Sequence, residues 1–269
     1  MTVVALVSAK RSPGASTAGL ALTLSWSTRI VLAECDPAGG DILAGYLSIL
    51  AIPGDHGLLR LARPDLREQL PSAFWGQLID LDAPHRRRLV LPGLSDPAQA
   101  TALRPTWPRL AELLAGLENA DPGYDVIADC GRLGLHTPWP VLERADLVLL
   151  VLRAVGLRDI APAAPALAVL RRQLSSSASR AGLGLLLVGE DTVGRRELQR
   201  RLRVAVVARL PDDRRTADAL CGLGRLRGGK DLLRHAASAE PKLRAAIARV
   251  RAPAPMPAPA PAREVHSGT

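Results

Sequence analysis

Short apolar runs alternate with segments of helical pattern along most of this chain, and this alternation restricts the fold more than any other feature. The runs are almost continuously apolar, as is typical of strands that are buried on both faces. Strands that alternate with helices form a parallel sheet. The sequence therefore predicts a three-layer α/β fold with a mostly parallel sheet and helices on both faces. We expect strands at residues 2–7, 30–33, 88–91, 124–128, 146–152, 183–188 and 204–208, and helices at residues 16–26, 41–50, 98–117, 157–177, 194–202, 214–222 and 230–251.

The chain divides into one large domain and a short tail. Of its 269 residues, 48% are hydrophobic, which is enough for a single α/β core over residues 1–251. Residues 252–269 begin with an Ala-Pro repeat, which favours an extended polyproline form, and we expect this tail to be disordered. Residues 53–120 show a less regular pattern, and we expect them to carry partner specificity.

The loop between the first predicted strand and the first predicted helix has the frame of a phosphate-binding loop. Residues 8–17 read SAKRSPGAST, whereas the standard pattern is GxxxxGK[ST]. Such a loop directs backbone N–H groups and the positive end of a helix at one point, which suits a phosphate group. When the loop is aligned on Gly14 and Ser16, Ala15 occupies the usual lysine position, while Ser16 keeps the hydroxyl that would contact magnesium. The alternative is an ordinary turn without a ligand.

Two further segments that could carry chemistry lie at the ends of predicted strands. One is ECDPAGGD at residues 34–41, and the other is DVIADCG at residues 125–131. Ligands bind at the carboxyl ends of strands in open α/β sheets, so both segments should lie beside the phosphate loop. We expect Asp36 and Asp129 to lie near magnesium there. The alternatives are a turn residue for Asp36 and a solvated strand end for Asp129.

The order and spacing of these motifs resemble the MinD/ParA family of P-loop ATPases over residues 1–235. That family has a deviant Walker A loop, KGGxGK[ST], whose additional signature lysine Lys10 matches. The resemblance implies that Asp36 positions the attacking water and that the base of ATP lies near residues 210–213. It implies a catalytic pair, Asp36 and Lys10, and a Mg²⁺ site of Ser16, Asp36 and Asp129. The nucleotide-binding residues that it implies are Lys10, Arg11, Ser12, Gly14, Ala15, Ser16, Thr17, Pro211 and Asp212.

The loop also departs from the family pattern. Arg11 and Ser12 replace two glycines, and Ala15 replaces the lysine that contacts the β- and γ-phosphates. Loss of that lysine should leave weak binding but impair turnover, because charge develops on the transferring phosphoryl group. In the family the signature lysine crosses a dimer interface, so the resemblance implies a homodimer in which Lys10 acts in trans. The loop and the DPAGGD segment also resemble a degenerate, partition-like subgroup from high-GC actinobacteria.

The resemblance implies an ATP-dependent dimeric switch in spatial positioning, with weak or absent hydrolysis. The cargo would belong to chromosome partition, septum-site selection or pilus assembly. The alternative is a non-catalytic scaffold that docks protein partners or DNA through a basic C-terminal region. Because Ala15 replaces the P-loop lysine, the sequence leaves open whether the protein is an enzyme.

Positive charge is concentrated in the C-terminal part of the chain. The net charge is +9, and residues 195–251 hold 16 Arg and Lys residues against 6 Asp and Glu residues. This stretch could bind DNA non-specifically, or it could form solvated helix faces. No apolar run approaches the roughly 18 residues that span a bilayer. Membrane-bound members of the MinD/ParA family end in an amphipathic helix, whereas this sequence ends in an Ala-Pro tail, so the resemblance does not lead us to expect membrane anchoring. The three cysteines lie far apart, which fits a reducing compartment, and we expect a cytoplasmic location.

Overall fold

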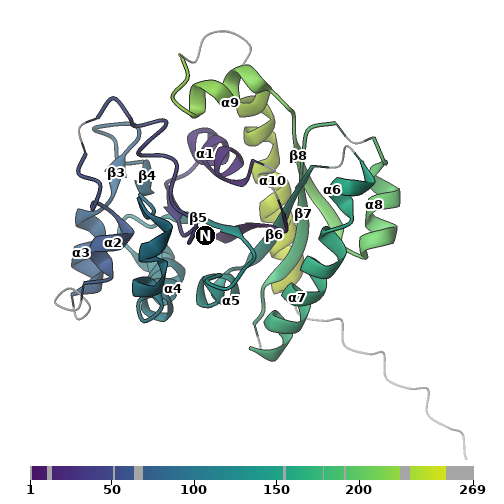
Figure 1. Ribbon diagram of the computed structural model, residues 1–269, viewed down its shortest axis with the longest axis horizontal. Coiled ribbons are helices and arrows are strands. Elements are labelled where there is room, and N and C mark those ends of the chain that lie inside the picture. Colours follow the sequence, from purple (N-terminus) through teal and green to yellow (C-terminus); the bar gives the residue numbers. More distant parts are fainter. Residues whose placement is uncertain are drawn as a thin grey trace, which may run out of the picture.

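A mostly parallel sheet forms the centre of the computed structural model, which describes residues 2–10, 14–50, 52–63, 69–153, 156–177, 179–190, 192–224 and 231–252. Eight strands run in the order β3-β4-β2-β5-β1-β6-β7-β8 (Figure 1). All neighbouring pairs are parallel except β3 with β4. The strands are β1 (Val3–Ser8), β2 (Ile30–Glu34), β3 (Ile79–Asp80), β4 (Arg88–Leu91), β5 (Asp125–Arg132), β6 (Leu147–Arg153), β7 (Gly182–Val188) and β8 (Ala205–Leu210).

Side chains of the strands alternate between two apolar cores, one on each face of the sheet. In β1, Val3, Ala5 and Val7 pack into one core. Val4 and Leu6 pack into the other. Because successive side chains of a strand point to opposite faces, burial on both faces requires the continuous apolar runs that the sequence contains.

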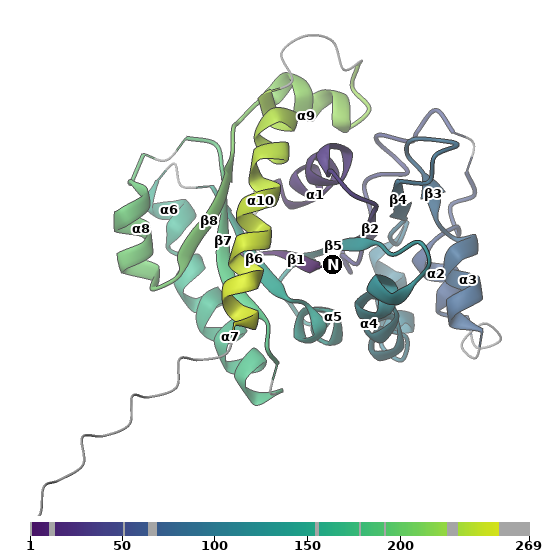
Figure 2. The same cartoon turned by 180° about the vertical axis from the view of Figure 1, so that it is seen from behind.

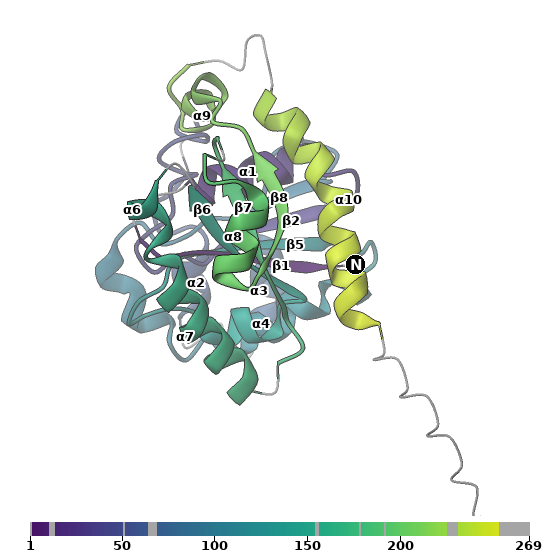
Figure 3. The ribbon, with the colours of Figure 1, turned by 90° about the vertical axis from the view of Figure 1, so that its right-hand side faces the viewer.

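Helices cover both faces of the sheet and confirm the predicted three-layer α/β fold. Figure 2 shows α10 running across one face, and Figure 3 shows α10 and α7 on opposite sides of the sheet. The face with α10 (Asp231–Arg251) is also covered by α1 (Ala15–Ser25) and α9 (Arg214–Leu220). The other face carries α2 (Leu58–Leu61), α3 (Leu70–Gly76), α4 (Trp107–Gly116), α5 (Trp139–Arg144), α6 (Leu157–Ile160), α7 (Ala163–Ser176) and α8 (Arg195–Leu202), with the 3-10 helices η2 (Pro97–Leu103) and η3 (Leu117–Asn119) nearby.

Two predicted helices are each divided, and proline explains the breaks. The segment 98–117 forms η2 and then α4, with Pro105 between them and Pro108 in the first turn of α4. The segment 157–177 forms α6 and then α7, with Pro162 as the N-cap of α7. Proline lacks the N–H group that a helix interior needs but is tolerated in the first turn, so each helix restarts near a proline.

The helix predicted at residues 41–50 is wrong, because the structure has a series of turns there. The spacing of its backbone hydrogen bonds is not constant. Gly45 N donates to Asp41 O, four residues earlier, whereas Leu47 N donates to Ile42 O, five residues earlier. Gly45 lowers the local helix propensity, and its backbone packs against the carbonyl of Cys221. Contacts with a distant part of the chain therefore override the local pattern.

A buried carboxylate connects the N-terminal strand, α1 and α10. Asp125 is 1% exposed and accepts hydrogen bonds from Thr2 N at 2.7 Å, Trp26 Nε1 at 2.9 Å and Thr28 Oγ1 at 2.7 Å. Arg244 of α10 donates to it at 2.7 Å and lies 5.2 Å from the centre of the Trp26 ring. Burial raises the pKa of Asp125, but the hydrogen bonds from Trp26, Thr28 and Arg244 outweigh it and lower the pKa below its usual value.

Two further points concern the predicted tail and the possibility of a membrane-spanning helix. Residues 253–269 of the predicted tail lie outside the described residues. Within the described ranges, no helix combines the length and the apolar character that crossing a membrane requires.

Candidate functional site

The N-terminus of α1 lies at the carboxyl end of β1, beside a cavity of about 230 Å³. Gly14 is the N-cap and adopts a φ of 92°, which glycine reaches readily. Among the described residues no side chain caps this helix end, so its first N–H groups can face a ligand. The residues that line the cavity come from β1, the start of α1, the segment after β2 and the end of β5: Ser8, Gly14, Ala15, Ser16, Thr17, Asp36, Ala38, Asp41, Gly131 and Arg132.

Asp129 of β5 contacts the first turn of α1 through Ser16. The Asp129 carboxylate is buried and accepts a hydrogen bond from Gly131 N at 3.0 Å. The Ser16 side chain lies close to it. Burial raises the pKa of Asp129 to about 6, although Ser16 and the Gly131 N–H oppose that shift. A hydroxyl and a carboxylate that meet at a helix N-terminus are oxygen ligands of the kind that Mg²⁺ takes.

Asp36 lies over the backbone of Gly131 at the edge of the same cavity. Its Oδ1 accepts a hydrogen bond from Ala38 N at 2.7 Å. Gly131 has a φ of 63°, and a Cβ atom there would stand 2.0 Å from Asp36 Cγ. Burial raises the pKa of Asp36, as does the charge of Asp41, while the Ala38 N–H and the charge of Arg132 lower it. A glycine at residue 131 therefore makes room for the carboxylate.

Glu34 is a buried acid to which the sequence analysis assigned no role. It is 2% exposed, and it stands opposite Asp129 in the register of β2 and β5. Its carboxylate accepts hydrogen bonds from Asp41 N at 2.8 Å, Ile42 N at 3.1 Å and Gly93 N at 3.1 Å. Burial raises the pKa of Glu34 to about 7 against those bonds. Glu34 thus fixes the path of the segment that carries Asp36 and Asp41.

Arg132 is a second residue that the sequence analysis missed. It ends β5, it is exposed, and it is the one cation among the described residues that line the cavity. The signal available in the sequence was its place at the carboxyl end of an apolar run, since that edge of a parallel sheet faces the ligand.

A second cavity of about 150 Å³ shares Gly14 and Thr17 with the first. Pro211 and Asp212, predicted near the base of a nucleotide, line this cavity. Arg153 at the end of β6 forms an ion pair with Asp212 there. Asp213 caps α9 by accepting a hydrogen bond from Thr216 N at 3.1 Å, and it also accepts one from Leu232 N at 3.2 Å.

Most of the predicted site residues meet at these two cavities. The first holds Gly14, Ala15, Ser16, Thr17 and Asp36, with Asp129 joined through Ser16, and the second holds Pro211 and Asp212. Lys10 is exposed and lines neither cavity. Arg11 and Ser12 lie outside the described residues.

The donor set fits a magnesium nucleotide better than a metal ion alone. Among the described residues no group of three or more His, Cys, Asp and Glu side chains is arranged to hold a metal ion. Two carboxylates and one hydroxyl at a helix end would leave several coordination positions open. Mg²⁺ normally fills such positions with water and phosphate oxygens.

No protein-family model and no curated protein sequence matches this chain. Solved structures do match it over most of its length. A ParA family ATPase from Chlorobium tepidum has a TM-score of 0.66 at 16% identity, covering 90% of this chain and 97% of that one. The MinD cell division protein of Aquifex aeolicus has a TM-score of 0.63 at 16% identity, covering 91% and 98%. McdA of Cyanothece in complex with ATP has a TM-score of 0.65 at 15% identity, covering 90% and 96%.

These similarities confirm the predicted resemblance at the level of the fold. The chain has the P-loop α/β fold of ParA and MinD ATPases, although the shared identity is 16% or less in these three comparisons. The closer likeness to a degenerate actinobacterial subgroup stays a prediction.

Proposed function

We propose that this protein binds ATP with Mg²⁺ at the N-terminus of α1 and uses the nucleotide to switch between monomer and homodimer. The observation that carries this proposal is the contact between the Ser16 hydroxyl and the buried Asp129 carboxylate, at a helix end that no described side chain caps. Asp36 lines the same cavity from the carboxyl end of the neighbouring strand β2. The helix N-terminus suits the phosphate groups of ATP, and the acidic oxygens at the same cavity suit its Mg²⁺ ion.

Each part of the cavity would have a separate task. The N–H groups of residues 14–17 would hold the phosphates, while Ser16, Asp129 and Asp36 would hold Mg²⁺ directly or through water. The base would lie toward Pro211 and Asp212 in the adjoining cavity. ATP supplies the anhydride bond, and Mg²⁺ supplies a divalent charge beside it. Asp36 would orient a water molecule for attack.

Hydrolysis would be slow or absent in this protein. Ala15 stands where a lysine would neutralise charge on the transferring phosphoryl group, and removal of such a charge impairs turnover much more than binding. Arg132 is the cation among the described residues that line the cavity, and it would offset part of this loss. The nucleotide would therefore act mainly through its binding.

Exposed apolar side chains support a homodimer that forms over the site. Ile49 and Leu135 are 90% and 92% exposed, and they lie on the segments that follow Asp41 and Arg132 at the cavity. Leu223 is 74% exposed, just after residues that contact Gly45. Large exposed apolar side chains around a site are typical of an interaction surface. Lys10, exposed at the end of β1, would reach the partner's nucleotide from such a face.

The biological role would be the positioning of a cellular cargo in the cytoplasm. The similar structures include a ParA family ATPase, a MinD cell division protein and McdA. Chromosome partition, septum-site selection and pilus assembly are the candidate processes. The basic stretch at residues 195–251 would allow non-specific DNA binding, which should weaken steeply with salt.

The absence of a lysine at residue 15 favours one alternative, a non-catalytic scaffold that keeps the fold without using nucleotide. Sedimentation of the full chain with ATP and Mg²⁺, with ADP, and without nucleotide separates the two functions. The switch predicts a dimer with ATP and Mg²⁺ alone, which is lost in Leu135→Asp and weakened in Lys10→Ala. The same oligomeric state in all three conditions would support the scaffold. A dimer that forms equally well in Lys10→Ala would contradict a role for Lys10 at the partner's nucleotide.

A further inference from the structure

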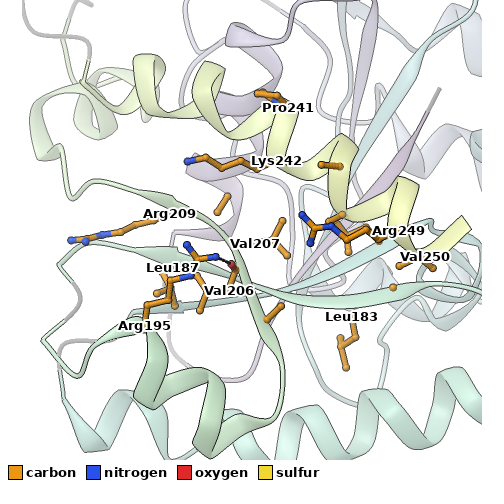
Figure 4. Close-up of a pocket in the computed structure, with 16 residues that line it drawn as sticks. Leu183, Leu187, Arg195, Val206, Val207, Arg209, Pro241, Lys242, Arg249 and Val250 are labelled. Carbon is orange, nitrogen blue, oxygen red and sulfur yellow. Dashed lines mark hydrogen bonds between the residues drawn. The ribbon is translucent and has the colours of Figure 1, made fainter. Parts of the chain in front are cut away.

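A groove that shares no lining residue with the two cavities at α1 follows the outer edge of the sheet. It has a volume of about 780 Å³ and lies between β8, the end of α8 that begins at Arg195, and the second half of α10 (Figure 4). We call it the β8–α10 groove. The residues that line it are Leu147, Gly182, Leu183, Leu187, Arg195, Ala205, Val206, Val207, Ala208, Arg209, Pro241, Lys242, Ala245, Ala246, Arg249 and Val250.

The interior of the β8–α10 groove is apolar because two glycines of β7 let valines approach the sheet. A Cβ atom at Gly182 would stand 2.6 Å from Val250 Cγ2, and one at Gly184 would stand 2.5 Å from Val207 Cγ2. Val207 is partly buried, and Val250 remains 42% exposed. A ligand that covered these valines would remove apolar surface from water, which favours binding.

Four cations surround this apolar interior. Arg195 and Arg209 come from α8 and β8, and Lys242 and Arg249 come from α10, with all four side chains exposed (Figure 4). The described residues that line the groove include no Asp or Glu. Arg195 donates to Val206 O at 2.8 Å and Arg209 to Gly189 O at 2.8 Å, so neutral carbonyls hold both guanidinium groups without cancelling their charge.

The outer edge of β8 is closed to strand addition at Val206, near the start of the strand. Val206 N donates to Gln199 Oε1 at 2.9 Å, and Val206 O accepts from Arg195. Side chains of α8 thus occupy the backbone groups that a paired strand would need. At this position recognition is left to the apolar side chains and the cations of the groove.

We propose that the β8–α10 groove docks a segment of a partner protein that combines carboxylate and apolar side chains. Carboxylates of the segment pair with Lys242, Arg249, Arg195 and Arg209, and its apolar side chains cover Val207 and Val250. Phosphates of DNA would pair with the cations but would leave the apolar interior uncovered. The groove shares no lining residue with the two cavities at α1.

The test selects ligands from a random-peptide display library on the full chain without nucleotide. The selected peptides should be rich in Asp, Glu and large apolar residues. Synthetic copies should bind Arg249→Glu and Lys242→Glu about threefold to tenfold more weakly, since each variant reverses one exposed charge. Val250→Ser should weaken binding by a similar factor. Arg172→Glu, an equal charge change at an exposed residue of α7, is the matched control and should leave binding within about twofold.

Four results would overturn the proposal, provided that the variants melt like the wild type. The first is selection of no peptide, or of peptides without acidic residues. The second is equal binding by Arg249→Glu, Lys242→Glu and Arg172→Glu. The third is competition by a short DNA duplex whose own binding the same variants weaken, which would assign the groove to nucleic acid. The fourth is competition by a synthetic peptide of residues 253–269, which would assign it to the chain's own tail.

Discussion

The carboxylate of Asp36 lies over the α-carbon of Gly131, so close that a Cβ atom at residue 131 would stand 2.0 Å from Asp36 Cγ. Asp36 follows β2 and Gly131 lies near the end of β5, and these strands are neighbours in the sheet. The two segments that carry the proposed Mg²⁺ ligands therefore fit together only with glycine at this position.

Gly131→Ala should displace Asp36 and weaken nucleotide binding. Its φ of 63° would strain alanine, and relief of the clash must move the Asp36 carboxylate, so we expect the free energy of unfolding to fall by about 1–3 kcal/mol. Gly134→Ala is the control, since its Cβ would meet only Arg132 O at 3.9 Å. Urea unfolding and ATP titration measure both effects. Wild-type stability and affinity in Gly131→Ala would contradict the packing described here.

Glu34 should make the stability of the nucleotide-free protein depend on pH. Burial raises its folded pKa from 4.5 to about 7, so its protonated form favours folding. The contribution is complete below pH 4.5 and is lost as the pH rises through 7, at up to about 1.4 kcal/mol per pH unit. Urea unfolding of the wild type and Glu34→Gln at several pH values measures this. The wild type should lose stability relative to the variant between pH 5 and 7, and parallel profiles would contradict the assignment.

The fold was readable from the sequence because both faces of the sheet are covered. Burial on both faces requires continuous apolar strands, so β4 was predicted with its observed bounds, Arg88–Leu91. Helix boundaries were harder, because Pro105 and Pro162 divide segments whose apolar pattern continues across them. Residues 41–50 were misread because their turns depend on Glu34 and Cys221, which the local sequence does not reveal.

The sequence predicted those candidate site residues that lie at the end of a predicted strand or in the phosphate-binding loop. Asp36, Asp129 and Ser16 stand at such positions, and they lie together in the structure. Glu34 and Arg132 were missed because their importance depends on which neighbours they meet across the sheet. Lys10 was predicted from a resemblance, and its exposed position leaves its role to the partner subunit of the proposed dimer.

Ala15→Lys should increase ATP hydrolysis. Ala15 lines the cavity at the first position of α1, so a lysine there could reach the phosphates. A cation that meets charge developing in the transition state should raise turnover by about tenfold or more. Ala15→Met has a similar length without charge and serves as the control. Equal turnover in the two variants would show that the missing cation does not limit hydrolysis.

Arg244→Met should destabilise the fold, because it leaves the buried Asp125 carboxylate without its cation. The Arg244 side chain is 34% exposed, which moderates the expected loss to roughly 2 kcal/mol in the free energy of unfolding. Because the pKa of Asp125 is lowered in the folded state, the loss should be present near neutral pH and should shrink as the pH falls below 4. Arg234→Met removes an exposed partner of Asp231 on the same helix and is the control. Equal losses in the two variants would contradict the Asp125 network.

Calorimetric titration of ATP into the full chain, with and without Mg²⁺, tests the nucleotide site most directly. We predict saturable binding that is stronger with Mg²⁺, and a loss of that Mg²⁺ dependence in Ser16→Ala, because the serine hydroxyl and Asp129 meet where the ion would bind. Ser72→Ala, at an exposed serine of α3, should behave like the wild type. An absence of binding at millimolar ATP, or Mg²⁺-dependent binding that Ser16→Ala leaves unchanged, would contradict the account.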